Sequence, residues 1–240
     1  MGVAGARKGK GLLLALLAVL LPRAAAAWPV DVSEDLRPGE ERFRRLSALE
    51  WVEVEDPSIA TAEVMESGEL LLTAKAPGRT LLLLYAEGRV AAWRIRVGGA
   101  PPKPDVLEAA VAATKKACPG LKAELDSVPE LTATVGDDRC RLALLKLLEQ
   151  DGFFAKNLSL TFEVPALQAQ LSSIQAGIAA VTKEKVDAHY LGAGLVLRGE
   201  LSAREHRKVL WEVFKRSVGR PAVNDEIEIR PAAGSDAGTK

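Results

Sequence analysis

The feature that most constrains this chain is a change in the spacing of its apolar residues near residue 100. From Val30 to Val97 these residues form short runs separated by turn pairs such as Asp56-Pro57 and Pro77-Gly78. Closely spaced short strands with Gly and Pro turns are typical of a small β-sandwich. After residue 104 the apolar residues follow helical and strand periods in turn. The sequence therefore predicts an α+β fold, in which an all-β sandwich is followed by units that contain helices.

Two strands expected within this sandwich have contrasting patterns. Leu81 to Leu84 form a continuous apolar run, which indicates a strand covered on both faces. Farther along, Trp93 and Ile95 alternate with Arg94 and Arg96, as in a strand with one buried and one solvated face. The sequence thus predicts one central strand and one half-buried strand.

The first 27 residues have the composition of a secretory signal peptide. A basic start is followed by the apolar run Leu12 to Leu21, which is too short to span a bilayer as a helix. Small residues then precede a cleavage site predicted between Ala27 and Trp28. The alternative is an uncleaved membrane anchor, which Pro22 and the alanine run disfavour. We therefore expect a protein exported to the periplasm.

Charge argues against a nucleic-acid partner. Without its first 27 residues the chain has 28 basic and 32 acidic residues, a net charge of −4. Proteins that neutralise many phosphates carry a basic patch or stripe, and none is visible here. The basic clusters at Glu41 to Arg45 and Arg204 to Arg207 are interrupted by acidic or apolar residues. We expect them to be the solvated faces of a strand and a helix.

A short linker separates the sandwich, expected at residues 28–97, from the rest of the chain. Residues 98–104 read Gly98-Gly99-Ala100-Pro101-Pro102-Lys103-Pro104. Prolines favour an extended, semi-rigid conformation, whereas the two glycines allow a bend. The linker is therefore expected to hold the flanking domains at a limited distance, where a partner can orient them.

The chain beyond the linker contains an internal repeat of about 65 residues. Both units are expected to have the element order α-β-β-α-β. The first, residues 105–164, has a helix at 105–118, strands near 121–125 and 131–135, a helix at 138–150 and a strand at 158–162. The second, residues 165–231, has a helix from Leu167, strands at 186–190 and 195–198, a helix at 202–217 and a strand at 223–229. A disordered tail is expected at residues 232–240.

The two cysteines are placed to form a disulfide. Cys118 lies at the end of the first expected helix and Cys140 at the start of the second, each on the apolar stripe of its helix. An α-β-β-α unit brings these two ends together, and an oxidising compartment favours the bond. Two buried free thiols are the alternative. Metal or redox chemistry has no support from a CxxC motif.

Catalytic and metal-binding patterns are missing from the sequence. The histidines, His189 and His206, have no cysteine or carboxylate at metal-ligand spacing in the sequence. Asp137 and Asp138 stand at an expected helix start, where capping and the helix dipole explain two acids. We therefore expect no enzyme activity, no cofactor and no metal.

Two motifs in the sandwich region resemble the N-terminal domain of pilus-assembly secretin proteins. The first motif is an Asp-Pro-x-Ile-Ala turn, and the second is a later Pro-Gly-x-Thr hairpin. They are formed by Asp56, Pro57, Ile59 and Ala60, and by Pro77, Gly78 and Thr80. The family serves Tad-like pili and type II and type III secretion machines. The resemblance implies a periplasmic assembly component.

The second repeat unit resembles a BON domain, a small periplasmic module with the same element order. Leu197 and Gly199 stand where that family has a strand ending in glycine, Ser202 where it has a capping residue, and Asn224 in its closing strand. Ser202 with Glu205 also forms a capping box, which marks a helix start independently. The first unit follows the BON pattern only in part.

These resemblances imply a non-enzymatic periplasmic component of a pilus-assembly or type II/Tad-like secretion apparatus. Its expected partners are a secretin or other proteins of the machinery, reached through sheet edges and helix faces, and a homo-oligomer is left open. The secretin pore region is missing from this sequence, so we do not expect pore formation. The alternative is a BON-type envelope-maintenance protein that binds phospholipid or peptidoglycan.

Overall fold

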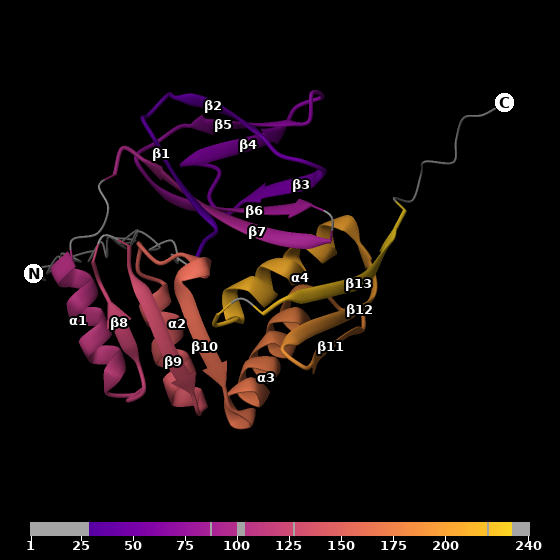
Figure 1. Cartoon of the computed structure of the whole chain (residues 1–240). Coiled ribbons are helices and arrows are strands. Elements are labelled where there is room, and N and C mark those ends of the chain that lie inside the picture. Colours follow the sequence, from indigo (N-terminus) through magenta and orange to yellow (C-terminus); the bar gives the residue numbers. More distant parts are fainter. Residues whose placement is uncertain (1–28, 87, 100–103, 127, 220, 232–240) are drawn as a thin grey trace, which may run out of the picture.

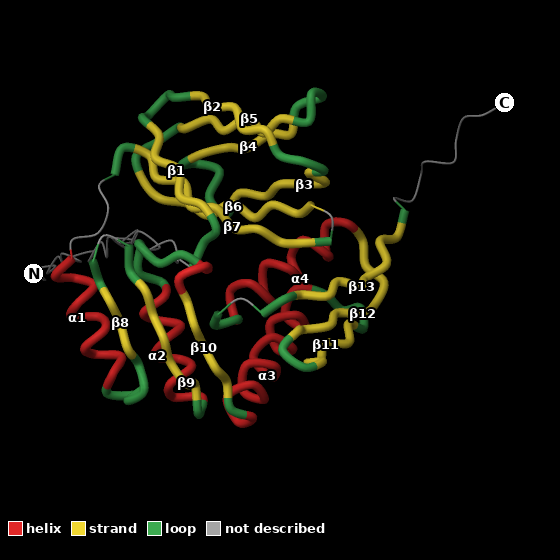
Figure 2. The backbone as a smooth tube through the Cα atoms, viewed as in Figure 1, coloured by secondary structure: helices red, strands yellow, loops and turns green. Residues whose placement is uncertain are grey.

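A computed structural model describes residues 29–86, 88–99, 104–126, 128–219 and 221–231. It has the predicted α+β class, with an all-β part followed by two units of helices and strands. Figure 2 shows this division directly, since the helices are confined to the lower part of the molecule and only strands and loops form the upper part. We name these parts the N-terminal sandwich (β1–β7), unit 1 (α1–β10) and unit 2 (α3–β13).

The N-terminal sandwich consists of two facing sheets. One sheet has the order β1-β7-β6-β3, formed by Val32–Leu36, Arg89–Val97, Gly78–Ala86 and Leu49–Val54. The other has the order β2-β5-β4, formed by Glu41–Arg45, Glu69–Ala74 and Ala60–Val64. Buried side chains of both sheets pack between them and include Leu70, Leu72, Leu82, Leu84 and Ile95. The alternation of apolar residues along β5 therefore forms the inner face of the smaller sheet.

Units 1 and 2 repeat one topology. Unit 1 contains α1 (Pro104–Lys115), β8 (Lys122–Glu124), β9 (Glu130–Val135), α2 (Asp138–Leu148), a short 3-10 helix η1 (Ala155–Asn157) and β10 (Leu158–Phe162). Unit 2 contains α3 (Val164–Val181), β11 (Val186–Leu191), β12 (Gly194–Ser202), α4 (Ala203–Arg216) and β13 (Val223–Arg230). In each unit the middle strand pairs antiparallel with the first strand and parallel with the last. The predicted element order is present in both.

The sandwich packs against unit 2, although the linker connects it to unit 1. Figure 1 shows β6 and β7 lying directly over α4, and Tyr85 of β6 donates a hydrogen bond to Asp225 of β13. One hydrophobic core includes Leu81 and Leu83 of the sandwich together with Leu210 of α4. The three parts thus form one packed body, whereas the linker sequence alone predicts tethered domains that a partner can orient.

The two contrasting strand predictions have different outcomes. Leu81 to Leu84 are at most 3% exposed, because the smaller sheet covers one face of β6 and α4 covers the other. The prediction for β7 was wrong at Arg94, whose side chain is 1% exposed. This second face of β7 is not solvated, since unit 1 supplies Asp151 as a partner for Arg94, and α4 of unit 2 packs near Ala92 on the same face. Strand β1 was not anticipated, because its sequence VSEDL lacks an apolar run.

Candidate functional site

The two family-type motifs meet inside the sandwich. The backbone N–H of Asp56 donates to Oγ1 of Thr80 at 2.9 Å, and Thr80 is fully buried. The side chain of Ile59 lies against Gly78, where an added Cβ would come within 2.9 Å of Ile59 Cδ1. Asp56 also accepts hydrogen bonds from the backbone and the hydroxyl of Ser58, which closes the turn. The motif residues therefore hold the turn at residues 56–60 against the turn at residues 77–80, which is a structural role.

The cysteine pair closes unit 1. Cys118 and Cys140 form a disulfide with a Cα–Cα distance of 4.6 Å. Both are buried in the core of unit 1, next to Leu144. Asp137 caps α2 by accepting a hydrogen bond from the backbone N–H of Cys140 at 2.8 Å. The disulfide thus joins the segment after α1 to the first turn of α2.

The BON-type positions of unit 2 also have structural roles. Ser202 caps α4, and its reciprocal hydrogen bonds with Glu205 complete the capping box. Gly199 has a φ of +156°, and a Cβ there would lie 2.8 Å from the carbonyl oxygen of Lys185. Leu197 is fully buried, whereas Asn224 is exposed and donates to Glu226. None of these residues lines a common site.

The predicted cleavage site at Ala27 and Trp28 lies outside the residues that the structure describes. Within the described ranges, no helix is both long and apolar enough to cross a membrane. Those ranges also contain no group of three His, Cys, Asp or Glu side chains suited to a metal ion.

The most elaborate side-chain cluster is at the contact between the sandwich and unit 2. Oδ2 of Asp225 accepts hydrogen bonds from the Tyr85 hydroxyl at 2.7 Å and from Nε2 of His206 at 2.6 Å. Trp51 stacks on Tyr85 with ring centroids 5.3 Å apart, and His206 meets Tyr85 edge-on. The Arg207 guanidinium makes a cation–π contact with the Trp51 ring, 5.5 Å from its centroid. We call Trp51, Tyr85, His206 and Asp225 the junction cluster.

Electrostatics in the junction cluster favour a buried carboxylate. Burial opposes ionisation of Asp225, but the hydrogen bonds from His206 and Tyr85 outweigh it and hold the pKa of this carboxyl below its usual value. Burial, together with the hydrogen bond to Asp225, raises the pKa of the Tyr85 hydroxyl. Tyr85 therefore remains a donor at neutral pH. The cluster provides a specific polar contact between the sandwich and unit 2.

A buried ion pair joins the sandwich to unit 1. Nε of Arg94 lies 2.8 Å from Oδ1 of Asp151, with side chains 1% and 6% exposed. Asp151 also lies 3.4 Å from Arg96. Burial lowers the pKa of the Arg94 guanidinium to about 10, and the charge of Asp151 opposes this effect. Beside this pair, the backbone of Val30 bonds to the segment around Phe153 and Ala155. Unit 1 therefore contacts both strand β7 and the segment that precedes β1.

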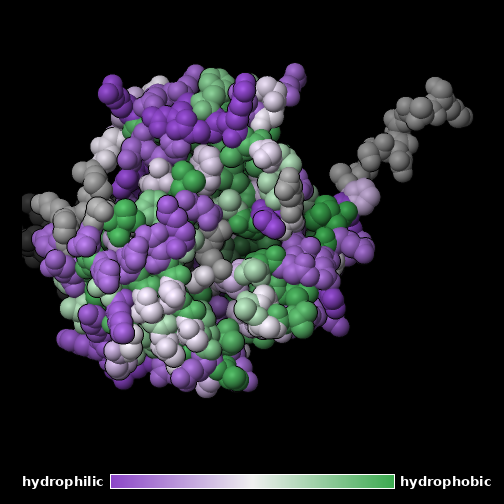
Figure 3. Space-filling view, viewed as in Figure 1, coloured by the Kyte–Doolittle hydropathy of each residue, from purple (hydrophilic) through white to green (hydrophobic). Residues whose placement is uncertain are grey.

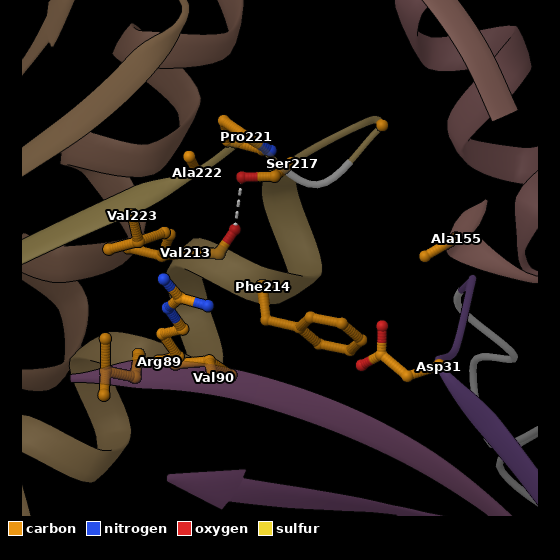
Figure 4. Close-up of a pocket in the computed structure, with 12 residues that line it drawn as sticks. Asp31, Arg89, Val90, Ala155, Val213, Phe214, Ser217, Pro221, Ala222 and Val223 are labelled. Atoms are coloured by element: carbon orange, nitrogen blue, oxygen red, sulfur yellow. Dashed lines mark hydrogen bonds between the residues drawn. The ribbon is translucent and has the colours of Figure 1, made fainter. Parts of the chain in front are cut away.

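A cleft of about 470 Å³ opens where the three parts meet. Figure 4 shows Phe214 of α4 pointing toward Asp31, and Arg89 and Val90 of β7 bordering the opposite side. The described lining residues are Asp31, Arg89, Val90, Ala155, Leu210, Val213, Phe214, Ser217, Gly219, Pro221, Ala222 and Val223. The only hydroxyl among them, Ser217, donates to the carbonyl of Val213. This lining has the size of a ligand pocket but presents no nucleophile beside a base.

The comparison with protein families gives a match over the sandwich. Residues 33–98 match the family described as the pilus formation protein N terminal region. The match covers β1 to β7 and includes both clamped turns. The predicted resemblance of this region to pilus and secretion proteins is therefore confirmed. The BON resemblance of unit 2 is not found by this comparison.

Solved structures give only distant similarities. Domains 4 and 5 of the S-layer protein SbsC are 14% identical, with a TM-score of 0.24, and the match covers 29% of this chain and 49% of that structure. CdsD, a structural protein of the type III secretion system of Chlamydia trachomatis, is 13% identical with a TM-score of 0.27. That match covers 57% of this chain and 68% of CdsD. This chain spans half or less of the S-layer structures that head the comparison. No curated protein matches the chain.

Sequence reasoning missed the junction cluster and the buried ion pair. Tyr85 and Asp225 are 140 positions apart, and neither lies in a recognisable motif. The carboxylate that contacts His206 is that of Asp225, 19 positions later in the sequence. The one available signal was an arginine at position 94 in a strand whose neighbours are apolar. A buried arginine requires an acidic partner, which periodicity cannot identify.

Proposed function

We propose that this chain is a non-enzymatic structural component of a pilus-assembly or type II/Tad-like secretion apparatus, exported to the periplasm. Its work is docking to a secretin or to other proteins of that machinery. The observation that supports this most is the family match over residues 33–98, which spans the N-terminal sandwich except for the first residue of β1. Pilus and secretion machines are built from repeated small modules, and two further modules follow here.

The polar groups of the molecule support a binding role over a catalytic one. The junction cluster and the Arg94–Asp151 pair are buried, and their partners lie within the fold. Among the described residues that line the cleft, Asp31 and Arg89 are the ionisable ones. Such groups hold modules in place and recognise other chains.

The packing limits which surfaces are free for docking. The sandwich covers α4, so this helix is not available in the packed body. The open face of the unit 1 sheet is available, because Thr132 and Thr134 of β9 and Ser159 and Thr161 of β10 are all exposed. Free sheet edges remain as well. We therefore place docking at open sheet faces and edges.

Capture from the cell envelope tests this role. The tagged chain is cross-linked in living cells and purified, and its partners are identified by mass spectrometry. We expect a secretin or another pilus or secretion protein, and fewer such cross-links when Thr132→Arg and Thr161→Arg alter the open sheet face of unit 1. The same pair of changes leaves the core unaltered, so the unfolding temperature serves as the control. Capture of no machinery component would refute the proposal.

Liposome flotation separates this proposal from the BON-type alternative. A docking protein remains at the bottom of the gradient with vesicles of anionic or neutral phospholipid. Flotation with the vesicles, or co-sedimentation with purified peptidoglycan, would instead favour an envelope-maintenance protein.

A further inference from the structure

Strand β2 is a sheet edge with a regular row of outward backbone groups. It pairs only with β5 among the described strands. The backbone N–H of Ala74 donates to the carbonyl of Glu40, so the even-numbered residues of β5 form their hydrogen bonds on the β2 side. The backbone N–H of Lys75 donates to the carbonyl of Ile59, on the β4 side. In an antiparallel ladder the hydrogen-bonding side alternates with each residue. The backbone groups of Glu41, Phe43 and Arg45 therefore point away from β5.

The same three residues place their side chains on the outer face of the sheet. Phe43 is opposite Leu71 on β5 and is 53% exposed. The Arg45 side chain is 91% exposed and makes an ion pair with Glu69 of β5 at 3.1 Å, whereas Glu41 has no side-chain hydrogen bond or ion pair within the described structure. Figure 3 shows a small hydrophobic area flanked by hydrophilic atoms at the top of the molecule, over β2 and β5. The order along the strand is thus acid, aromatic, base.

This order is complementary to itself in the antiparallel direction. The geometry points to a dimer in which β2 of one copy pairs with β2 of a second copy across a two-fold axis at Phe43. Glu41 of each copy then lies opposite Arg45 of the other, and the two Phe43 rings are neighbours. Directly opposite unlike charges and aromatic pairs stabilise antiparallel strands. The two three-stranded sheets become one continuous sheet, joined by an isologous contact.

The inner face of β2 supports this pairing. Inward-pointing charges often protect an edge strand against pairing, and Arg42 and Arg44 point inward here. Both are already neutralised, since Arg44 makes two hydrogen bonds to Glu34, and Arg42 bonds to Glu34 and Glu40. Each copy therefore contributes two arginines and two glutamates, and no net charge, along this face. Registers shifted by two residues set a charged side chain against Phe43 and lose the charge pairing.

The inference deepens the docking role proposed above by naming a second copy as one partner, and it rests on that role for its biological setting. The dimer itself is measured on purified protein without any secretin. Loss of the dimer would therefore leave the secretion role standing, and failure to capture machinery proteins would leave the dimer standing.

Charge reversal tests the register. Sedimentation velocity of the full chain is expected to show a monomer–dimer equilibrium. Glu41→Arg or Arg45→Glu alone each place like charges opposite one another twice, and weaken dimerisation about tenfold. An equimolar mixture of the two single variants restores association, because reversed position 41 then faces reversed position 45. Glu63→Arg, on the same outer face but on β4, is the matched control and leaves the equilibrium unchanged.

Cross-linking tests the axis. Phe43→Cys brings two thiols opposite each other at a Cα separation of about 5.5 Å, which a disulfide can span. Oxidation is expected to give a covalent dimer on a non-reducing gel, and Thr61→Cys on β4 gives none. A wild-type protein that stays monomeric at all accessible concentrations would overturn the inference. So would a mixture of the single variants that fails to associate, or a Glu63→Arg variant as impaired as Glu41→Arg.

Discussion

The Arg94–Asp151 ion pair gives a sharp prediction about what holds the sandwich to unit 1. Both side chains are almost fully buried, and burial lowers the pKa of Arg94 to about 10, so the fold already disfavours this cation. Asp151→Ala removes the carboxylate at 2.8 Å and leaves the charge without its counter-ion. Breaking a buried pair in this way costs about 3–5 kcal/mol, which corresponds to roughly 10 °C in the unfolding temperature for a chain of this size.

Replacing both partners is expected to cost much less. Arg94→Met with Asp151→Ala removes the buried charges together, and Arg96 retains its bidentate contact with Asp35. Buried pairs replaced by apolar residues are often neutral in stability. Urea unfolding at pH 7 of wild type, both single variants and the double variant gives the coupling energy.

The exposed residue Glu130 provides a control for this series. Glu130 lies on the open face of β9, and Glu130→Ala is expected to change the free energy of unfolding by less than about 0.5 kcal/mol. Our reasoning fails if Asp151→Ala costs no more than this control. It also fails if the double variant is as unstable as the sum of the two single variants.

Three further predictions concern other contacts. Tyr85→Phe removes the hydroxyl that donates to Asp225 at 2.7 Å, so unfolding in urea should show a loss of about 1.5–3 kcal/mol, and no loss would contradict a native hydrogen bond. Ser202→Ala removes the α4 cap and is expected to cost about 1 kcal/mol, whereas Ser202→Asp should retain most stability in thermal unfolding. Glu34 has a pKa lowered below its usual 4.5, chiefly by its hydrogen bonds with Arg44. Its stabilising contribution is therefore complete above pH 4.5 and is lost as pH falls through the lower folded pKa, so acid titration of Glu34→Gln should show a shallower decline than wild type.

Local chemistry made much of the fold predictable. The element order of units 1 and 2, the cap at Ser202 and the pairing of Cys118 with Cys140 all depend on residues close in sequence or on one simple topology. A capping box marks a helix start because both hydrogen bonds form within one turn. The apolar run from Leu81 to Leu84 likewise predicts a strand that is covered on both faces, and all four residues are buried.

Contacts between the modules were not predictable in the same way. Periodicity shows which face of an element is apolar, but not which other element covers it. Arg94 therefore looked solvated, and the polar partners Tyr85, His206 and Asp225 looked unrelated. The composition of residues 98–104 predicts a linker between tethered domains. It does not reveal that the sandwich packs on unit 2.

The covering of β6 by α4 has a consequence for how the chain reaches its native state. The ribosome makes the amino-terminal part of the chain first, yet the hydrogen bond of Tyr85 cannot form until Asp225, 140 positions later, has been made. During that interval Leu81 and Leu83 have no α4 to pack against, so a sandwich that folds early exposes an apolar face that is prone to aggregation. The sandwich therefore cannot complete its packing until α4 has been made. We expect a truncated chain that ends before α4 to bind chaperones that hold unfolded or partly folded proteins.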